Sequence, residues 1–382
     1  MAFDIAMFAD KLTRYCNQLE IRVGDLSSAT GISMDRIQCL LDQKSEPTGD
    51  EVLILADFFK CDYKFFISNE PLAPFEQTES LFRKYGDELT REDKWAIQEF
   101  LFLCECEEFL MSILNTKGRN TLKFQKRGTF FKQHGWDAAS ALRKQLGYRN
   151  IEIPADVYND FRSIGLHVFR RQLGKSSISG LCILHPVAGK CVLVNYSEDS
   201  FRQRFSAAHE AGHAILNEET DPPISFSQWK AKDLSEIRAN AFASHFLLPP
   251  EYLTKIPDAK NWDETKIQEW AVKLKVNPEP LLLALKDSGL LDNERYLQLK
   301  HTKIPRGIKI DPELPQGLPE PAKHRKADLL KRGLSTQYVN LCFTAYDNGL
   351  ITAGRLAEML LLDKAELPEV ANLYGRALSY GH

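Results

Sequence analysis

Two histidines and a glutamate stand in a His-Glu-x-x-His pattern at His209, Glu210 and His213. The alanine-rich segment 202–219 favours a helix, and no proline interrupts it before Pro222. On a helix, residues four apart lie one turn apart on the same face, so both imidazoles can bind a single Zn²⁺. Glu210, beside the first histidine, can then act as general base toward the attacking water.

A catalytic zinc site of this kind needs a third protein ligand. The segment 234–250, LSEIRANAFASHFLLPP, has the apolar residues of a packed helix. Glu236 precedes Asn240 by four residues, so both lie on one face of that helix. We expect Glu236 to bind zinc and Asn240 to orient a histidine. Two His and one Glu would leave the fourth coordination position of the zinc ion open for water.

Two other interpretations of the pattern stay open. A five-residue match occurs by chance, and a surface helix can carry two histidines without binding metal. A zinc site can also persist without catalysis. The helical context and the downstream Glu-x-x-x-Asn helix favour the catalytic interpretation.

The same residues carry a family resemblance. RQRFSAAHEAGHAIL, followed by EIRANAFASHFLLP, resembles the ImmA/IrrE family of bacterial metallopeptidases over about residues 137–250. The resemblance implies a small sheet before the active helix, with a strand near 190–196. It also implies a repressor protein as the substrate, cleaved during stress or mobile-element induction. By the family's pattern the ligands are His209, His213 and Glu236, with Glu210 as the catalytic glutamate.

The sequence departs from the family pattern in two places and leaves one role open. Arg238 stands where the family has a second glutamate, and His245 where it has an acidic or non-titrating residue. His245 is a candidate to stabilise the oxyanion of a cleaved peptide, although a histidine on a helix surface needs no such role. Tyr196 and His185 are weaker candidates. The sequence does not identify the oxyanion donor.

The N-terminal residues resemble an Xre/Cro-type helix-turn-helix domain. Gly31 sits in the expected turn, and Ser33 is the expected N-cap of the third helix. The pattern predicts helices at about 5–19, 23–29, 33–42, 49–60 and 62–67. The predicted core comprises Leu26, Ile32, Ile37, Leu40, Leu53, Ala56 and Phe59.

DNA binding by this module would place its third helix in the major groove. Arg36 and Gln38 are then the best base readers, beside Ser33 and Met34. However, residues 1–70 hold seven Lys/Arg against twelve Asp/Glu, a difference of −5. Because phosphate attraction supplies most non-specific affinity for DNA, docking of a protein or dimerisation is the alternative use of the fold.

The whole chain has 382 residues, a net charge of −3 and 43% hydrophobic residues. This overall charge predicts neither nucleic-acid nor membrane affinity. We find no secretory signal and no apolar run of bilayer length, and the eight cysteines lack metal-binding spacing. We therefore expect a cytoplasmic protein with reduced thiols, and a homodimer is possible.

The predicted fold is mostly α, with a small α+β zincin-like core and helical N- and C-terminal regions. Five prolines between residues 302 and 322 predict an extended linker. The helical C-terminal region is expected to cap the peptidase core or to sense a substrate. The expected parts are 1–70 (helix-turn-helix), 71–136 (helical linker), 137–260 (metallopeptidase) and 261–382 (C-terminal region).

These patterns together predict a zinc endopeptidase coupled to a helix-turn-helix module and directed at a repressor. The main alternative is a DNA-binding regulator, or an antitoxin-like protein, whose zinc domain senses without catalysis. A weaker alternative is self-cleavage in a linker at 68–80.

Overall fold

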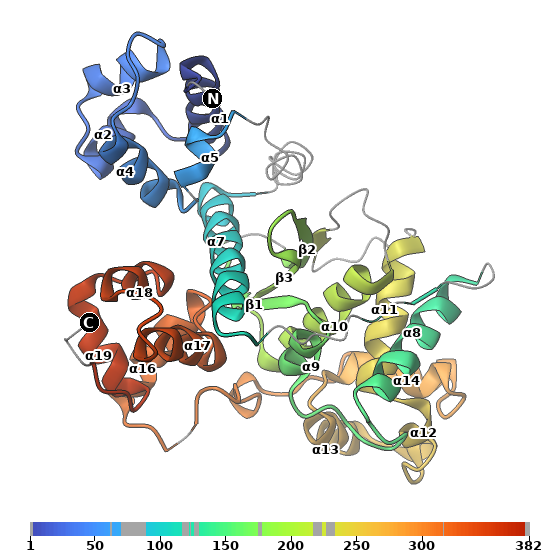
Figure 1. The fold of residues 1–382 in the computed structure, drawn as a ribbon. Coiled ribbons are helices and arrows are strands. Elements are labelled where there is room, and N and C mark those ends of the chain that lie inside the picture. Colours follow the sequence, from blue (N-terminus) through green and yellow to red (C-terminus); the bar gives the residue numbers. More distant parts are fainter. Residues whose placement is uncertain are drawn as a thin grey trace. The chain divides into compact units, whose positions relative to one another are not determined.

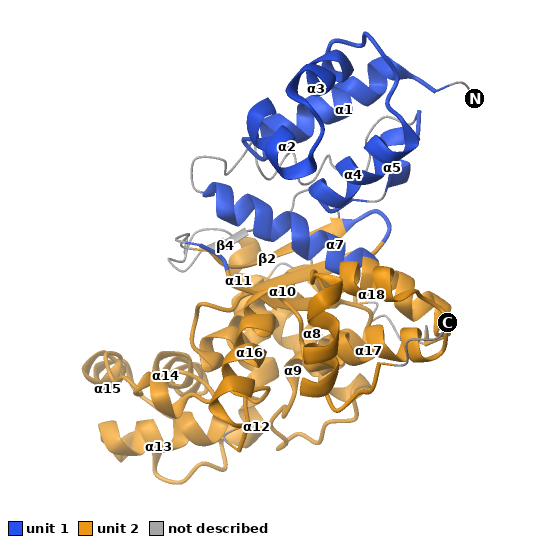
Figure 2. Cartoon of the chain, turned by 90° about the vertical axis from the view of Figure 1, so that its left-hand side faces the viewer, with its two compact units in different colours: residues 1–105, 173–176, 185–187 blue, residues 106–172, 177–184, 188–382 orange. Residues whose placement is uncertain are grey.

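The computed structural model describes residues 3–61, 63–69, 89–116, 122, 124–125, 130–174, 178–216, 224–226, 234–315 and 317–378. The chain divides into two compact units, coloured separately in Figure 2. The first unit is Met1–Glu105 with Leu173–Ser176 and His185–Val187, and the second is Cys106–Gln172, Ser177–Leu184 and Ala188–His382. The described residues are mainly helical with a small mixed sheet (Figure 1), which confirms the predicted fold class.

The N-terminal module contains the five predicted helices, each within two residues of its expected ends. Gly31 ends the second helix in a left-handed conformation (φ 75°), which glycine adopts without strain. Ser33 caps the third helix by accepting from the Arg36 amide. The helices are α1 (Ile5–Gln18), α2 (Val23–Thr30), α3 (Met34–Leu41), α4 (Gly49–Phe59) and α5 (Tyr63–Ile67).

The prediction that Leu53 belongs to the N-terminal core is wrong. Leu53 is 54% exposed, whereas Val52 of the same helix is buried. The buried face of α4 follows Val52, Leu55, Ala56 and Phe59, at spacings of three and four residues. Leu53 is turned about 100° from Val52 on the helix and therefore leaves that face. The other six predicted core residues are buried.

Helix α7 (Arg91–Ile113) lies within residues 71–136, which were predicted to form a helical linker. Residues 70–88 lie outside the described residues, and so does most of the linker proposed for self-cleavage. Within the described part of the chain, no helix has the length and apolarity needed to cross a membrane.

The sheet supports the helix that carries the His-Glu-x-x-His pattern. Its strand order is β1-β3-β2-β4, with β1 parallel to β3 and β4 antiparallel to β2. The predicted strand near 190–196 is confirmed as β3, and its residues 191–195 are buried. The strands are β1 (His167–Arg171), β2 (Ile178–His185), β3 (Gly189–Asn195) and β4 (Ile224–Phe226).

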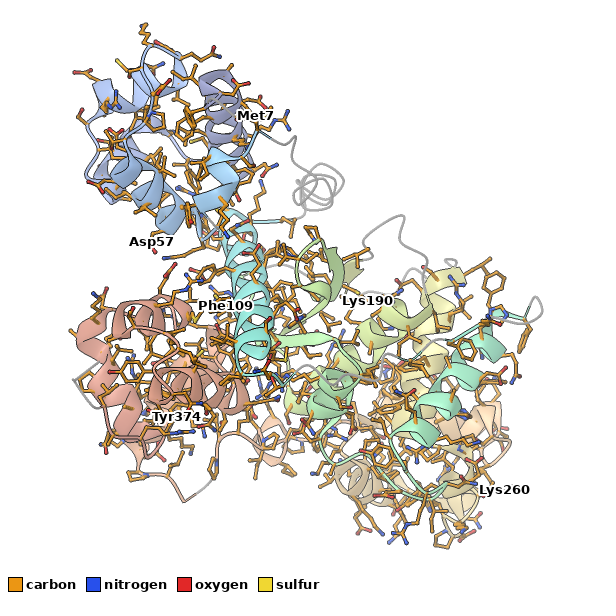
Figure 3. All side chains as sticks on the ribbon, viewed as in Figure 1. Met7, Asp57, Phe109, Lys190, Lys260 and Tyr374 are labelled. Atoms are coloured by element: carbon orange, nitrogen blue, oxygen red, sulfur yellow. The ribbon has the colours of Figure 1, made fainter. Side chains whose placement is uncertain are left out.

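Helix α10 (Ser200–Leu216) is held at both ends. The Asp199 carboxylate accepts from the first free amides of the helix, those of Phe201 and Arg202. At the other end Lys190, labelled in Figure 3, reaches from β3 to the carbonyl of Ala214 at 2.5 Å. A cation at a helix C-terminus complements the helix dipole.

Two glycines let three helices approach closely. Helix α11 (Leu234–Leu247) packs against both α8 (Phe131–Gln145) and α10. A Cβ at Gly135 of α8 would lie 2.4 Å from the Arg238 carbonyl oxygen. A Cβ at Gly212 of α10 would lie 3.1–3.2 Å from atoms of α11. The absent side chains therefore set the spacing of the helices that carry the candidate site.

Of the remaining second-unit helices, the first two belong to the predicted peptidase region and the others to the C-terminal region. They are α9 (Val157–Ser163), α12 (Pro250–Leu253), α13 (Glu264–Leu274), α14 (Pro278–Asp287), α15 (Asn293–Leu299), α16 (Glu320–Lys331), α17 (Thr336–Asp347), α18 (Ala353–Met359) and α19 (Leu367–Leu373).

The Pro-rich stretch is irregular, as predicted, but it is anchored rather than free. Apart from a 3-10 turn at Arg306–Ile308, its described residues before α16 form no regular element. Arg170 of β1 is 4% exposed and donates to Asp311 at 2.8 Å and to Glu313 at 2.6 Å. Such buried, charge-assisted contacts hold the stretch against the sheet.

Candidate metal centre

Three side chains converge between α10 and α11. The Nε2 atoms of His209 and His213 are 3.0 Å apart. Glu236 places Oε1 3.1 Å from Nε2 of His213 and Oε2 3.3 Å from Nε2 of His209. His209 and His213 are buried and Glu236 is half-buried. The predicted ligand set is brought together in space.

These separations fit a single small cation. Ligands of a tetrahedral zinc ion at its usual bond lengths lie about 3.3–3.5 Å from one another. The observed separations are 3.0–3.3 Å, only slightly shorter. Two imidazole nitrogens and a carboxylate also match the ligand preference of zinc and related transition metals. The residues present therefore fit a metal ion.

Asn240 completes the histidine geometry from the next turn of α11. Its Oδ1 lies 3.1 Å from Nδ1 of His209. A carbonyl oxygen accepts, so this contact requires the proton of neutral His209 on Nδ1. The lone pair of Nε2 then faces the Glu236 carboxylate and His213, where a cation would satisfy it.

The electrostatics of Glu236 agree with this arrangement. Burial alone would raise the pKa of its carboxyl group. Hydrogen bonds and charge interactions with His209 and His213, when these rings are protonated, outweigh that effect and hold the pKa well below its usual range. Glu236 is therefore ionised, as a metal ligand must be.

Glu210 is fully buried beside the cluster and packs against strand β2. A Cβ at Gly180 of β2 would lie 2.9 Å from Cγ and 3.0 Å from Oε1 of Glu210. The strand therefore needs glycine at this position. Sequence reasoning missed Gly180, because nothing in its neighbourhood marks a contact with a residue thirty positions away.

The comparison with protein families agrees with this geometry. Residues 161–286 match the family model Peptidase_M78, described as the IrrE N-terminal-like domain. The match includes both histidines, Glu210, Glu236 and Asn240. It supports the predicted ImmA/IrrE relationship of this segment and a metallopeptidase role for it. No curated protein matches the chain.

The match to the IrrE N-terminal-like domain begins and ends later than the predicted peptidase region. It leaves out α8, although α8 packs against α11, and it includes α13 and nearly all of α14. Residues 1–70 lie outside it, so their relationship to Xre/Cro domains stays a prediction.

The candidate oxyanion residues have their described contacts elsewhere. His245 Nε2 lies 3.1 Å from Ser140 Oγ on α8. The Tyr196 ring lies 5.4 Å from the Arg170 guanidinium, within the group that anchors the Pro-rich stretch. His185 pairs with Glu105 in the first unit. None of these contacts involves a member of the metal cluster, and the oxyanion role stays a prediction.

The candidate DNA-reading residues lie on helix α3 or, for Ser33, at its N-cap. Ser33, Met34 and Gln38 are exposed, and Met34 is 56% exposed. Arg36 is half-buried and donates to both carboxylate oxygens of Glu51, at 2.7 and 2.8 Å. Gln38 donates to Asp42 at 2.8 Å. Arg36 therefore fastens α3 to α4, and its use in reading bases stays a prediction.

Proposed function

We propose that this chain is a zinc-dependent endopeptidase that cleaves a protein substrate, a transcriptional repressor. One observation carries the proposal. His209, His213 and Glu236 converge with metal-ligand separations, and Glu210 lies beside the first of them on the same helix. The match to the IrrE N-terminal-like domain supports the peptidase class.

The residues have separate tasks in this proposal. A zinc ion held there would supply Lewis-acid chemistry, polarising a peptide carbonyl and making water more acidic. Glu210 takes a proton from the water that attacks the carbonyl carbon. It then delivers the proton to the amide nitrogen as the carbon–nitrogen bond breaks. Asn240 keeps His209 in the tautomer that leaves Nε2 free for the metal.

The repressor substrate is a proposal that rests on the family resemblance. In this proposal, cleavage of the repressor releases transcription under stress or during mobile-element induction. The N-terminal module binds DNA or docks the repressor. A cytoplasmic location agrees with the eight cysteines, none of which forms a disulfide among the described residues.

The test combines metal content with proteolysis. Full-length protein is stripped with a chelator, reloaded with zinc and measured by elemental analysis. It is then incubated with small Xre-type repressors as candidate substrates, and fragments are identified by mass spectrometry. We expect one zinc per chain and cleavage at a defined bond.

Matched variants separate the loss of zinc binding from the loss of catalysis. Glu210→Gln should keep zinc and lose cleavage by at least about 100-fold. His209→Ala and Glu236→Gln should lose both, and the exposed control Glu264→Gln should lose neither. A folded wild type that takes up no zinc on titration overturns the proposal. Equal cleavage by wild type and Glu210→Gln overturns the assigned base.

A further inference from the structure

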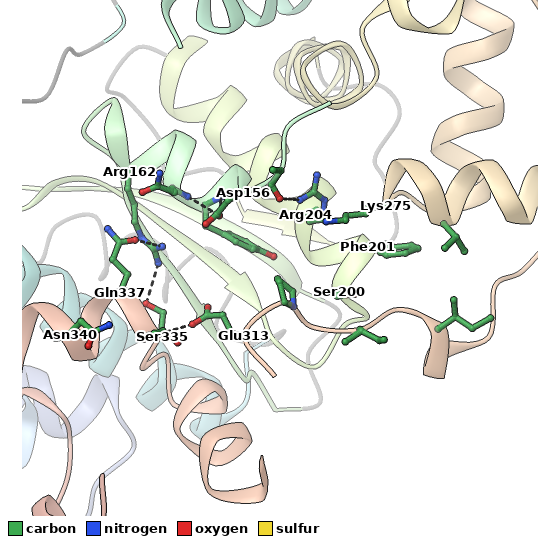
Figure 4. Close-up of a pocket in the computed structure, with 18 residues that line it drawn as sticks. Asp156, Arg162, Ser200, Phe201, Arg204, Lys275, Glu313, Ser335, Gln337 and Asn340 are labelled. Atoms are coloured by element: carbon green, nitrogen blue, oxygen red, sulfur yellow. Dashed lines mark hydrogen bonds between the residues drawn. The ribbon is translucent and has the colours of Figure 1, made fainter. Parts of the chain in front are cut away.

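A second cavity lies in the same unit, apart from the metal cluster. Its volume is about 790 Å³, within the range of small-molecule sites. Its walls come from α9, the start of α10, the end of α13, the Pro-rich stretch and the start of α17 (Figure 4). No member of the metal cluster lines it.

Two buried arginines line this cavity without a carboxylate partner. Arg162 and Arg204 are 8% and 6% exposed. Within the described residues, neither has a carboxylate within ion-pair distance, and neither has a partner for its buried Nε–H. Burying a guanidinium without a carboxylate in direct contact is costly, so two in one cavity wall are a signal of ligand binding.

The remaining hydrogen bonds of these arginines fix their positions. Arg204 donates to the carbonyl oxygens of Ala155 at 3.0 Å and Pro154 at 2.7 Å. Arg162 donates to Val168 O at 2.6 Å and to the Gln337 side chain at 2.8 Å. These acceptors orient the guanidinium groups but are neutral. Asp156 and Asp160 attract Arg204, and Glu313 attracts Arg162, but none of these carboxylates lies within ion-pair distance.

The two acidic residues of the wall make their direct contacts with groups other than Arg162 and Arg204. Glu313 accepts from Arg170 at 2.6 Å and from the Thr336 amide at 2.6 Å. Asp156 caps α9 by accepting from two backbone amides at 3.1 Å. Lys275, which is exposed, adds a third positive charge to the lining. The cavity therefore favours an anion.

Apolar side chains make up much of the other lining. They belong to α10, α13 and the Pro-rich stretch, and would contact a hydrocarbon or aromatic body: Phe201, Val272, Ile308, Ile310 and Pro312. A ligand that matches both parts has an anionic head group and an apolar body.

We propose that this cavity binds a small amphiphilic anion, a carboxylate or phosphate attached to an apolar body. The head group would lie between Arg162 and Arg204 and place an anionic group in direct contact with them. Because Arg204 lies on α10 and Gln337 on α17, the ligand would join the C-terminal region to the helix that carries the metal ligands. The binding step does not depend on the proposed peptidase activity.

The test measures binding to the full-length protein by isothermal titration calorimetry. Phenyl phosphate and 3-phenylpropionate are the anionic probes, and 3-phenylpropanol is the neutral control. We expect at least one anion to bind at least tenfold more tightly than the alcohol, and the tighter one identifies the head group. No binding of either anion at millimolar concentration overturns the proposal. Equal binding of the alcohol also overturns it, because charge would then play no part.

Variants locate the bound anion. Arg204→Gln should weaken binding at least tenfold. Because Arg204 also holds two backbone carbonyls, Lys275→Glu on the exposed rim is the second variant and should weaken binding severalfold. Lys260→Glu is the control, with the same charge change at an exposed position outside the cavity lining. Wild-type affinity in a folded Lys275→Glu, or equal losses in Lys275→Glu and Lys260→Glu, overturns the assignment to this cavity.

Discussion

Gly180 of strand β2 lies so close to Glu210 of helix α10 that no side chain fits between them. A Cβ at position 180 would be 2.9 Å from Glu210 Cγ and 2.9 Å from the backbone oxygen of Leu193. The first neighbour belongs to the proposed general base and the second to the adjacent strand. The strand and the base therefore fix each other's positions.

Gly180→Ala should displace the Glu210 carboxylate and reduce proteolysis while zinc binding persists. An error of about 1 Å in a catalytic group can cost on the order of 100-fold in rate. We expect a fall in kcat/KM of at least about tenfold, with zinc content unchanged by elemental analysis. Gly307→Ala is the control, because a Cβ there meets nothing within 4 Å. Full activity in Gly180→Ala would show that β2 does not position the base.

Asn240→Ala should weaken zinc binding rather than abolish it. The 3.1 Å contact from His209 Nδ1 to Asn240 Oδ1 fixes the tautomer and orientation of the ring. Loss of such a partner typically lowers metal affinity about 10–100-fold. Competition with a chromophoric chelator measures the affinity. Asn240→Asp keeps an oxygen acceptor and should restore most of it, whereas equal losses in both variants would argue against the hydrogen bond.

Gly135→Ala should destabilise the second unit by opening the contact between α8 and α11. The added Cβ would lie 2.4 Å from Arg238 O and 2.7 Å from Phe242 N. Because backbone atoms cannot move aside easily, the cost lies at the upper end of about 1–3 kcal/mol for overpacking. It exceeds the gain of about 1 kcal/mol in helix propensity.

The measurement for Gly135→Ala is the thermal unfolding midpoint, which should fall by roughly 4–8 °C. Gly24→Ala in α2 is the control, because its Cβ would meet only Met34 Cε at 4.0 Å. That variant should be neutral or slightly stabilised. A stabilised Gly135→Ala would show that the helices can separate at little cost.

The ligand set could be predicted because its information is local. His209 and His213 are one helical turn apart, and so are Glu236 and Asn240, so each pair follows from helix periodicity. The packing of α10 against α11 is a tertiary contact, and helix periodicity alone does not predict it. The family resemblance implied it. The N-terminal helices were predictable for a similar reason, since Gly31 and Ser33 mark their ends directly.

What the sequence did not reveal depends on contacts between distant segments. Leu53 has the side chain of a core residue, and only the orientation of α4 leaves it exposed. Arg36 has the chemistry of a base reader, but Glu51 engages it from fifteen residues away. Arg162 and Arg204 resemble ordinary charged positions of a helix until burial without a carboxylate in direct contact marks them.

The pair of Arg36 and Glu51 predicts how the stability of the N-terminal module depends on pH. The hydrogen bonds from Arg36 lower the pKa of Glu51 from 4.5 to about 2. The folded module therefore binds fewer protons than the unfolded chain between these values. The stabilisation is fully present above pH 4.5 and is lost as the pH falls toward 2.

Arg36→Met should remove this stabilisation at pH 7 but have a progressively smaller effect below pH 4.5. Hydrogen exchange of α3 and α4 peptides in the full-length protein, corrected for the chemical exchange rate, measures the protection at pH 7, 5 and 3.5. We expect the difference between wild type and Arg36→Met to be similar at pH 7 and 5 and smaller at pH 3.5. Arg14→Met is the control, because its pair with Asp10 is half exposed on both sides and contributes little. A difference that stays constant down to pH 3.5 would mean that packing of the Arg36 side chain, rather than its charge, joins α3 to α4.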